Sequence, residues 1–156
     1  SLASQDPGLS KQLGVVVFGK QAEQYASLFP FPIYPMNYVS NEKELVDIYN
    51  AVDLYVTPSL QDNLPNTIVE AMACGIPCVG FNVGGIPQMI DHLHNGYVAE
   101  YQSAKDLANG IRWTLTEGEY DNLSEEACRK ALSSYSESII SMRYIDIYNK
   151  ITGSHA

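Results

Sequence analysis

The chain has 156 residues, of which 46% are hydrophobic and 17% are charged, so it can bury the core of one ordinary domain. Its 18 acidic and 9 basic residues give a net charge of −9. This balance argues against a nucleic-acid-binding protein and against electrostatic attachment to a membrane, because both need clustered Lys and Arg. The longest apolar runs, such as residues 15–18, are too short to span a bilayer.

The first half of the chain predicts short strands that alternate with helices. Three short, largely apolar segments fit buried strands: residues 13–18, 33–39 and 54–56. Helices are expected at 21–28 and after Asn41, where Glu44 follows in the pattern of a capping box. The apolar face of the second helix recurs at helical spacing and consists of Leu45, Ile48, Tyr49 and Val52.

The second half continues the alternation. A helix is expected over 66–74, with Gly75 at the left-handed position that follows a helix, and a strand over 78–81. The remaining expected elements are a Gly84-Gly85 turn, a short helix opened by Pro87, a strand at 97–98, a helix that starts with a capping box of Ser103 and Asp106, a loop at 117–122 and C-terminal helices at 124–151. The tyrosines from Tyr135 to Tyr148 are expected to be packing residues.

Strands that alternate with helices favour right-handed βαβ crossovers. The predicted fold class is therefore α/β, with a doubly wound, Rossmann-like parallel sheet. In such sheets, ligands bind at the carboxyl ends of the strands, where loops lead into helix N-termini. Three loops therefore become candidate sites, namely those that follow Phe18, Val56 and Phe81.

The loop after Val56 carries the strongest chemical signal. The helix start that follows it offers unpaired N–H groups and a partial positive charge, which suit a phosphate or diphosphate. Asp62 precedes this helix start, and Glu70 lies about one turn inside the helix. Carboxylates accept hydrogen bonds from hydroxyl groups, so we expect these two residues to face the diols of a ribose and of a sugar. A nucleotide-sugar, with hydroxyls at both ends and phosphates between them, has this layout.

The same residues resemble those of a known family. Asp62 and Glu70 are separated by seven residues, and Glu70 opens the run Glu-Ala-Met-Ala-Cys-Gly-Ile-Pro-Cys-Val, which is followed by Gly84-Gly85-Ile-Pro. Together with residues 45–59, this segment resembles the C-terminal, donor-binding domain of the family 4 (group 1) retaining glycosyltransferases, which have the two-domain GT-B fold. The resemblance covers residues 15–115 and so includes most of the chain.

The resemblance implies roles for the loop residues. Asp62 stands in place of the family's first glutamate, which contacts the transferred sugar. Asp62 is therefore the expected catalytic residue. Glu70 matches the family's second glutamate, which binds the nucleotide ribose. The family's Gly-Phe-Gly is Asn63-Leu64-Pro65 here, and Pro65 brings no amide N–H to the diphosphate. The expected donor-binding residues besides Glu70 are Asn63, Leu64, Pro65, Asn66, Thr67, Gly19, Gly84 and Gly85.

The resemblance also implies a larger protein. Residues 13–19 match the second strand of the family's donor domain, and nothing that resembles the first strand precedes them. We therefore expect residues 1–156 to form a single truncated nucleotide-sugar-binding domain that is inactive alone. The whole protein is expected to be a hexosyltransferase-type enzyme of polysaccharide biosynthesis, with a missing N-terminal domain that binds a glycan or a lipid-linked acceptor. It is expected in the cytoplasm, or as a peripheral protein at the inner face of the membrane.

The expected donor is a UDP- or GDP-sugar, with no metal and no other cofactor. Cys74, Cys78 and Cys128 fit buried free thiols better than a metal site or a disulfide framework. His92 and His94 fit surface residues, because no third ligand lies at a suitable spacing.

Three alternative functions are weighed. Asp62 and Pro65 depart from the family pattern, so a binding-only, degenerate GT-B domain stays open, as does a GT-B nucleotide-sugar epimerase. A phosphoacceptor signalling domain of the flavodoxin type is disfavoured, because it needs acidic residues where Gly19-Lys20 and Thr57-Pro58 stand.

Overall fold

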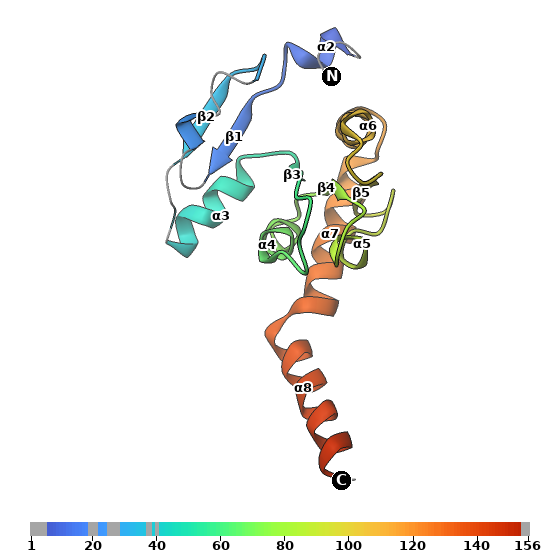
Figure 1. The fold of residues 1–156 in the computed structure, drawn as a ribbon. Helices are drawn as coiled ribbons and strands as arrows, with labels where there is room; N and C mark the ends of the chain where they lie inside the picture. The colour runs from blue at the N-terminus through green and yellow to red at the C-terminus, as the bar shows by residue number, and fades with distance from the viewer. Residues whose placement is uncertain (1–5, 19–21, 25–28, 37–38, 40, 154–156) are drawn as a thin grey trace.

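The structure is a computed structural model that describes residues 6–18, 22–24, 29–36, 39 and 41–153 (Figure 1). Its N-terminal part holds a short helix, two strands and a longer helix: α2 (Pro7–Ser10), β1 (Val15–Phe18), β2 (Ile33–Met36) and α3 (Glu42–Asn50). β1 and β2 pair in parallel, with Val15 opposite Ile33. Much of the expected helix at 21–28 and the end of the expected strand at 33–39 lie outside the described residues.

A second parallel sheet contains β3 (Tyr55–Thr57), β4 (Cys78–Phe81) and β5 (Gly96–Ala99) in that spatial order. Every residue of β4 is buried, as expected for a central strand with both faces covered. The helices that connect and follow these strands are α4 (Asn66–Ala73), α5 (Ile86–Met89) and α6 (Ala104–Thr116). The parallel sheets and the alternating helices confirm the α/β prediction.

The two sheets are separate, and no described strand lies between β1 and β3. In a doubly wound sheet the six strands, numbered along the chain, lie side by side in the order 3-2-1-4-5-6. The two described sheets fit this order as two separate parts. The pair β2-β1 fits positions 3 and 2, and β3-β4-β5 fits positions 4 to 6. In that order the position between β1 and β3 belongs to a first strand, and none of the described strands occupies it. In Figure 1, β1 lies between β2 and the second sheet.

The core lies around α4, and it is formed by β4, α5 and α7 (Tyr120–Tyr135) together with Tyr49 from α3. α7 packs closely against the end of α4, because a Cβ at Gly75 would lie 2.8 Å from the Ser124 hydroxyl oxygen. The predicted loop at 117–122 is too long, because α7 already begins at Tyr120. No described side chain caps α7, so its start at Tyr120 has no local sequence signal, and buried Leu123 and Ala127 hold the helix in place.

Two local predictions need correction. The first concerns the capping boxes. The side chains of both expected N-cap residues do accept a hydrogen bond from a backbone amide of their helix: Asn41 from Lys43 and Ser103 from Asp106. However, the Asp106 carboxylate does not complete a capping box, because it accepts from the Tyr97 hydroxyl and the Glu100 amide. The second correction concerns the thiols: all three are free, but only Cys78 is fully buried.

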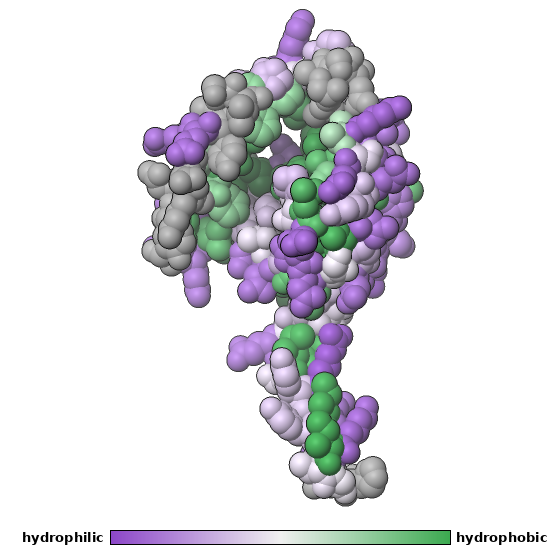
Figure 2. Space-filling model, viewed as in Figure 1, coloured by the Kyte–Doolittle hydropathy of each residue, from purple (hydrophilic) through white to green (hydrophobic). Residues whose placement is uncertain are grey.

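The last helix, α8 (Glu137–Thr152), follows Ser136, whose extended backbone separates it from α7. α8 extends away from the sheets (Figure 1), and none of its described residues is buried. Tyr144 is 60% exposed and Tyr148 is 63% exposed, so the prediction that they are packing residues is wrong for this chain. Figure 2 shows hydrophobic surface on this projecting helix. No described helix combines the length and the apolar character that crossing a bilayer requires.

Candidate functional site

The loops that follow β3 and β4 meet at the carboxyl ends of these strands. An ideal Cβ at Gly84 would lie 1.7 Å from the carbonyl oxygen of Asp62, and one at Gly85 would lie 1.9 Å from that of Asn63. Gly84 also has a φ of +57°, which glycine adopts without strain. The Gly84-Gly85 turn therefore packs directly against the backbone of Asp62 and Asn63. Gly19, a further predicted donor-binding residue, lies outside the described residues.

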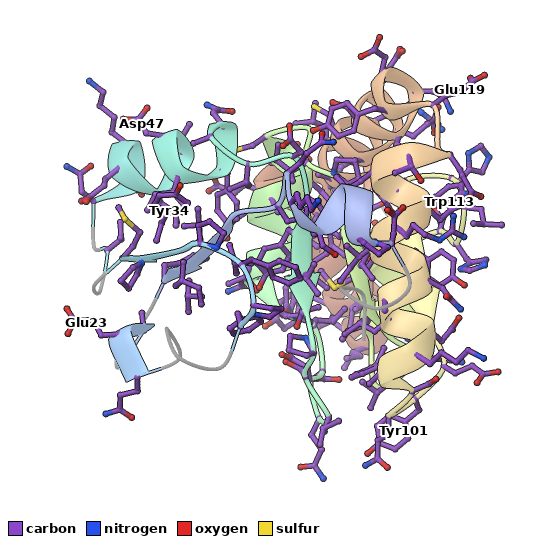
Figure 3. All side chains as sticks on the ribbon, turned by 90° about the horizontal axis from the view of Figure 1, so that it is seen from above. Glu23, Tyr34, Asp47, Tyr101, Trp113 and Glu119 are labelled. Carbon is purple, nitrogen blue, oxygen red and sulfur yellow. The ribbon has the colours of Figure 1, made fainter. Side chains whose placement is uncertain are left out.

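A third loop reaches the same place. The hydroxyl of Tyr101, which follows β5, donates a hydrogen bond to the Leu60 carbonyl oxygen at 3.3 Å. Figure 3 shows Tyr101 at the end of the molecule where the tip of the loop after β3 projects. The Tyr101 side chain is 48% exposed and so is accessible to a ligand. Sequence reasoning missed this residue, because a lone tyrosine after a strand carries no distinguishing signal.

The N-terminus of α4 opens toward these loops without a side-chain cap among the described residues. Pro65 is the N-cap residue, and its carbonyl oxygen accepts from the Ile68 amide at 3.0 Å. The helix begins at Asn66, as predicted. The amides of Asn66 and Thr67 occupy the first turn, where helix N–H groups have no intrahelical acceptor and favour an anion.

Glu70 lies one turn further along α4, half-buried, and is held by Tyr49. The Tyr49 hydroxyl lies 3.1 Å from Glu70 Oε2 and 3.3 Å from the Thr67 carbonyl oxygen. Tyr49 is only 1% exposed, and burial, followed by the nearby Glu70 carboxylate, raises the pKa of its hydroxyl well above the ordinary value. The sequence identified Tyr49 only as part of an apolar helix face.

Tyr55 connects the first turn of α4 to β3. Its hydroxyl donates to Thr67 Oγ1 at 2.8 Å. Burial raises the pKa of Tyr55, and the carboxylates of Glu70 and Asp62 add to this rise, against the lowering effect of the bond to Thr67. Both carboxylates therefore lie close enough to the Tyr55 hydroxyl to raise its pKa. Asp62 is half-buried, whereas Asn63, Leu64 and Asn66 are exposed.

The site contains no cationic side chain from the central part of the sequence, because residues 44–104 include no Lys and no Arg. Positive potential on this segment comes from main-chain N–H groups alone. Among the described residues, no group of three or more His, Cys, Asp and Glu side chains could hold a metal ion. His92 is exposed, and its Nδ1 accepts from the Val98 amide, so it has a local structural contact.

Comparison with known proteins decides the family. The family model for glycosyl transferases group 1 matches residues 35–131. The chain belongs to this family. The match includes the loop after β3, all of α4 and the Gly84-Gly85 turn, which are the elements that form the candidate site.

Group 1 relatives with assigned names are longer than this chain. The N,N'-diacetylbacillosaminyl-diphospho-undecaprenol alpha-1,3-N-acetylgalactosaminyltransferase of Campylobacter jejuni is 30% identical over 117 residues, which are 74% of this chain and 31% of the relative. The D-inositol 3-phosphate glycosyltransferase of Saccharomonospora viridis is 26% identical over 96% of this chain and 37% of its own length. The chain thus spans about a third of each of these relatives.

Solved structures establish the fold. HepE of Anabaena, crystallised in complex with UDP, superposes with a TM-score of 0.79 at 19% identity and covers 96% of this chain. Sucrose-phosphate synthase of Thermosynechococcus elongatus has a TM-score of 0.78 at 19% identity. This chain covers 43% and 42% of those two proteins. It has the Rossmann-like architecture of the C-terminal half of a GT-B glycosyltransferase.

Proposed function

We propose that this chain is the donor-binding part of a retaining glycosyltransferase that moves a hexose-type sugar from a UDP- or GDP-sugar to a glycan or a lipid-linked acceptor. One observation carries the proposal: Asp62 and Glu70 stand on either side, in sequence, of a helix start that has no side-chain cap, and both carboxylates raise the pKa of the same hydroxyl, that of Tyr55. Relatives support the ligand class, since HepE of Anabaena was crystallised with UDP and with UDP-glucose. The name of the Campylobacter relative supports a lipid-linked acceptor.

Each part of the donor has a matching group. The amides of Asn66 and Thr67 hold the diphosphate, which carries negative charge before transfer and gains more as it leaves. Glu70 accepts hydrogen bonds from the ribose hydroxyls. Asp62 accepts from the transferred sugar and stabilises positive charge that develops on its ring. Gly84 and Gly85 let the loop that carries Asp62 and Asn63 lie directly against their own turn, beside the diphosphate.

The missing cationic groups come from the rest of the protein. Helix amides alone neutralise a diphosphate incompletely, and residues 44–104 supply no Lys or Arg. We infer that a further strand between β1 and β3, together with its following loop, completes the donor pocket in the whole protein. The acceptor then binds to a second domain across the cleft, in a cytoplasmic or peripheral membrane-associated enzyme. The 156-residue chain by itself binds nucleotide weakly and has no turnover.

Nucleotide binding to this chain tests the proposal. Saturation-transfer NMR with UDP and GDP detects weak contacts, and we expect signal from the ribose protons of at least one nucleotide. Glu70→Ala reduces this signal, whereas Glu125→Ala, a change to an exposed residue of α7, leaves it unchanged. Equal signal in both variants would remove Glu70 from the ribose site.

A binding-only domain is the second candidate, because Asp62 is one methylene shorter than the family's glutamate and Pro65 removes an amide. The intact protein with a panel of nucleotide-sugars separates the two candidates. Transfer to an acceptor supports the enzyme, and donor binding without any transfer supports the binding-only domain. Release of free UDP from a donor without an acceptor points instead to an epimerase.

A further inference from the structure

The contact between Tyr49 and Glu70 joins two elements that are 21 residues apart. Tyr49 belongs to α3, next to the first sheet, and Glu70 belongs to α4, next to the second sheet. One hydroxyl therefore connects the carboxylate of the candidate site to a helix outside the loops that form that site.

The Tyr49 ring is fixed by packing. It makes edge-on contacts with Phe18, at 5.9 Å between ring centroids, and with Tyr55, at 6.1 Å. The core around it includes fully buried Ile68 and Met72. A side chain that is held in this way keeps its hydroxyl in one position, and its raised pKa keeps that hydroxyl protonated across the pH range in which proteins work.

We propose that Tyr49 is a positioning residue for donor binding: its hydroxyl donates to Glu70 Oε2 and fixes the carboxylate in the orientation that accepts both hydroxyls of the nucleotide ribose. This inference rests on the proposed function. The Thr67 carbonyl oxygen also lies near the hydroxyl, but one proton cannot fully serve two acceptors, and the bond to a carboxylate is the stronger one. A Glu side chain without this contact has free torsions, and ordering them on ligand binding costs entropy.

The consequence is a specific link between Tyr49 and the ribose diol. If Tyr49 acts by orienting Glu70, then removing the hydroxyl weakens recognition of the ribose hydroxyls and leaves the diphosphate contacts at α4 largely unchanged. If Tyr49 only packs in the core, its loss changes the binding of all nucleotides to the same extent. Nucleotides with and without ribose hydroxyls distinguish these cases.

The experiment compares UDP with its dideoxy analogue, which lacks both ribose hydroxyls, on the 156-residue chain by NMR titration. We expect the chain to prefer UDP by about 10- to 100-fold, as for hydroxyls that bond to a carboxylate. In Tyr49→Phe this preference falls to about 3-fold or less, because the carboxylate is no longer oriented. Tyr49→Phe keeps the ring, so the core packing is retained, and urea unfolding verifies that the variant folds.

Tyr55→Phe is the matched control. It removes a half-buried hydroxyl that bonds to Thr67 in the same turn of α4, and no hydrogen bond of the described residues joins that hydroxyl to Glu70, so the preference for UDP is retained. A preference in Tyr49→Phe equal to that of the unchanged chain overturns the positioning role and leaves the proposed function in place. No contact with either nucleotide, by contrast, rejects the donor site and the positioning role together.

Discussion

The carbonyl oxygen of Asp62 occupies the space that a side chain at Gly84 would need, since a Cβ there would lie only 1.7 Å away. This contact sets the spacing between the loops after β3 and β4. The backbone that carries the expected catalytic carboxylate therefore rests directly on the turn that precedes α5. Any residue larger than glycine at position 84 must push these two loops apart.

Gly84→Ala is expected to destabilise the protein and to disrupt the donor site. The left-handed backbone alone costs about 1–2 kcal/mol for a residue with a Cβ, and the clash with Asp62 adds to this cost. Urea unfolding, followed by the fluorescence of the single tryptophan, Trp113, measures the loss. Gly153→Ala is the control, because Gly153 has a similar φ of +69° and no atom of the described part of the chain lies within 4 Å of its ideal Cβ. Equal losses in the two variants would show that the contact with Asp62 contributes nothing.

Asp62 and Glu70 are expected to affect different kinetic constants of the intact protein. Asp62→Asn removes a charge that acts on the reacting sugar, so kcat falls by about 100-fold or more while the affinity for free UDP changes little. Glu70→Ala removes ribose contacts, so UDP binds about 10-fold more weakly. Steady-state kinetics with UDP inhibition measures both effects. A loss of UDP affinity in Asp62→Asn with unchanged kcat would exchange the proposed roles.

Local sequence signals were sufficient where a structure depends on neighbouring residues. The start of α4 after Pro65 and the left-handed Gly75 behind it follow from backbone preferences alone. The same holds for β4, whose apolar run predicts a buried strand. The family motif identifies Asp62 and Glu70, because their spacing around a helix start is unusual.

Sequence signals failed where a contact depends on tertiary structure. Tyr49 and Tyr101 form hydrogen bonds with partners that are 21 and 41 residues away in sequence. Neighbouring residues do not indicate which distant atom a tyrosine hydroxyl contacts. The start of α7 was missed for a related reason, since buried Leu123 stabilises a helix whose first turn is polar and uncapped. For α8, the apolar pattern was correctly associated with a helix, but the described part of the chain provides no surface that buries it.

Alkaline pH is expected to destabilise the protein through Tyr49. Burial raises the pKa of this hydroxyl in the folded state above its ordinary value of 10.0, so the unfolded chain loses the proton first. The stabilisation is therefore complete below pH 10.0 and falls as the pH rises further, by about 1.4 kcal/mol per pH unit for one such group. Urea unfolding between neutral and strongly alkaline pH measures this slope. Tyr49→Phe makes the slope shallower, whereas Tyr148→Phe, at an exposed position, does not; identical slopes in both variants would contradict this role of Tyr49.

The thiols are expected to differ in reactivity according to burial. Cys78 has no exposed surface, and burial raises its pKa, so it should react with a thiol reagent only after unfolding. Cys74 and Cys128 are partly exposed and should react in the folded chain, with Cys74 slowed by a pKa that burial and the nearby Cys128 raise. Thiol titration before and after denaturation counts both classes. Cys128→Ser should lower the number of thiols that react in the folded chain and leave the reactivity of Cys78 unchanged. Rapid labelling of Cys78 in the folded chain would contradict this prediction and show that the sheet opens readily.

The two isoleucines Ile68 and Ile147 test the isolation of α8. Ile68 is fully buried in α4, so Ile68→Ala should reduce the free energy of unfolding by about 2–5 kcal/mol through lost burial and a residual cavity. Ile147 is 51% exposed on α8, so Ile147→Ala should change the free energy of unfolding by less than about 0.5 kcal/mol. Urea unfolding at several protein concentrations measures both. If Ile147→Ala lowers the free energy of unfolding strongly, and more so at higher protein concentration, the apolar side of α8 is covered by a second copy of the chain. A small loss at every concentration means that α8 contributes little to the stability of the fold around α4.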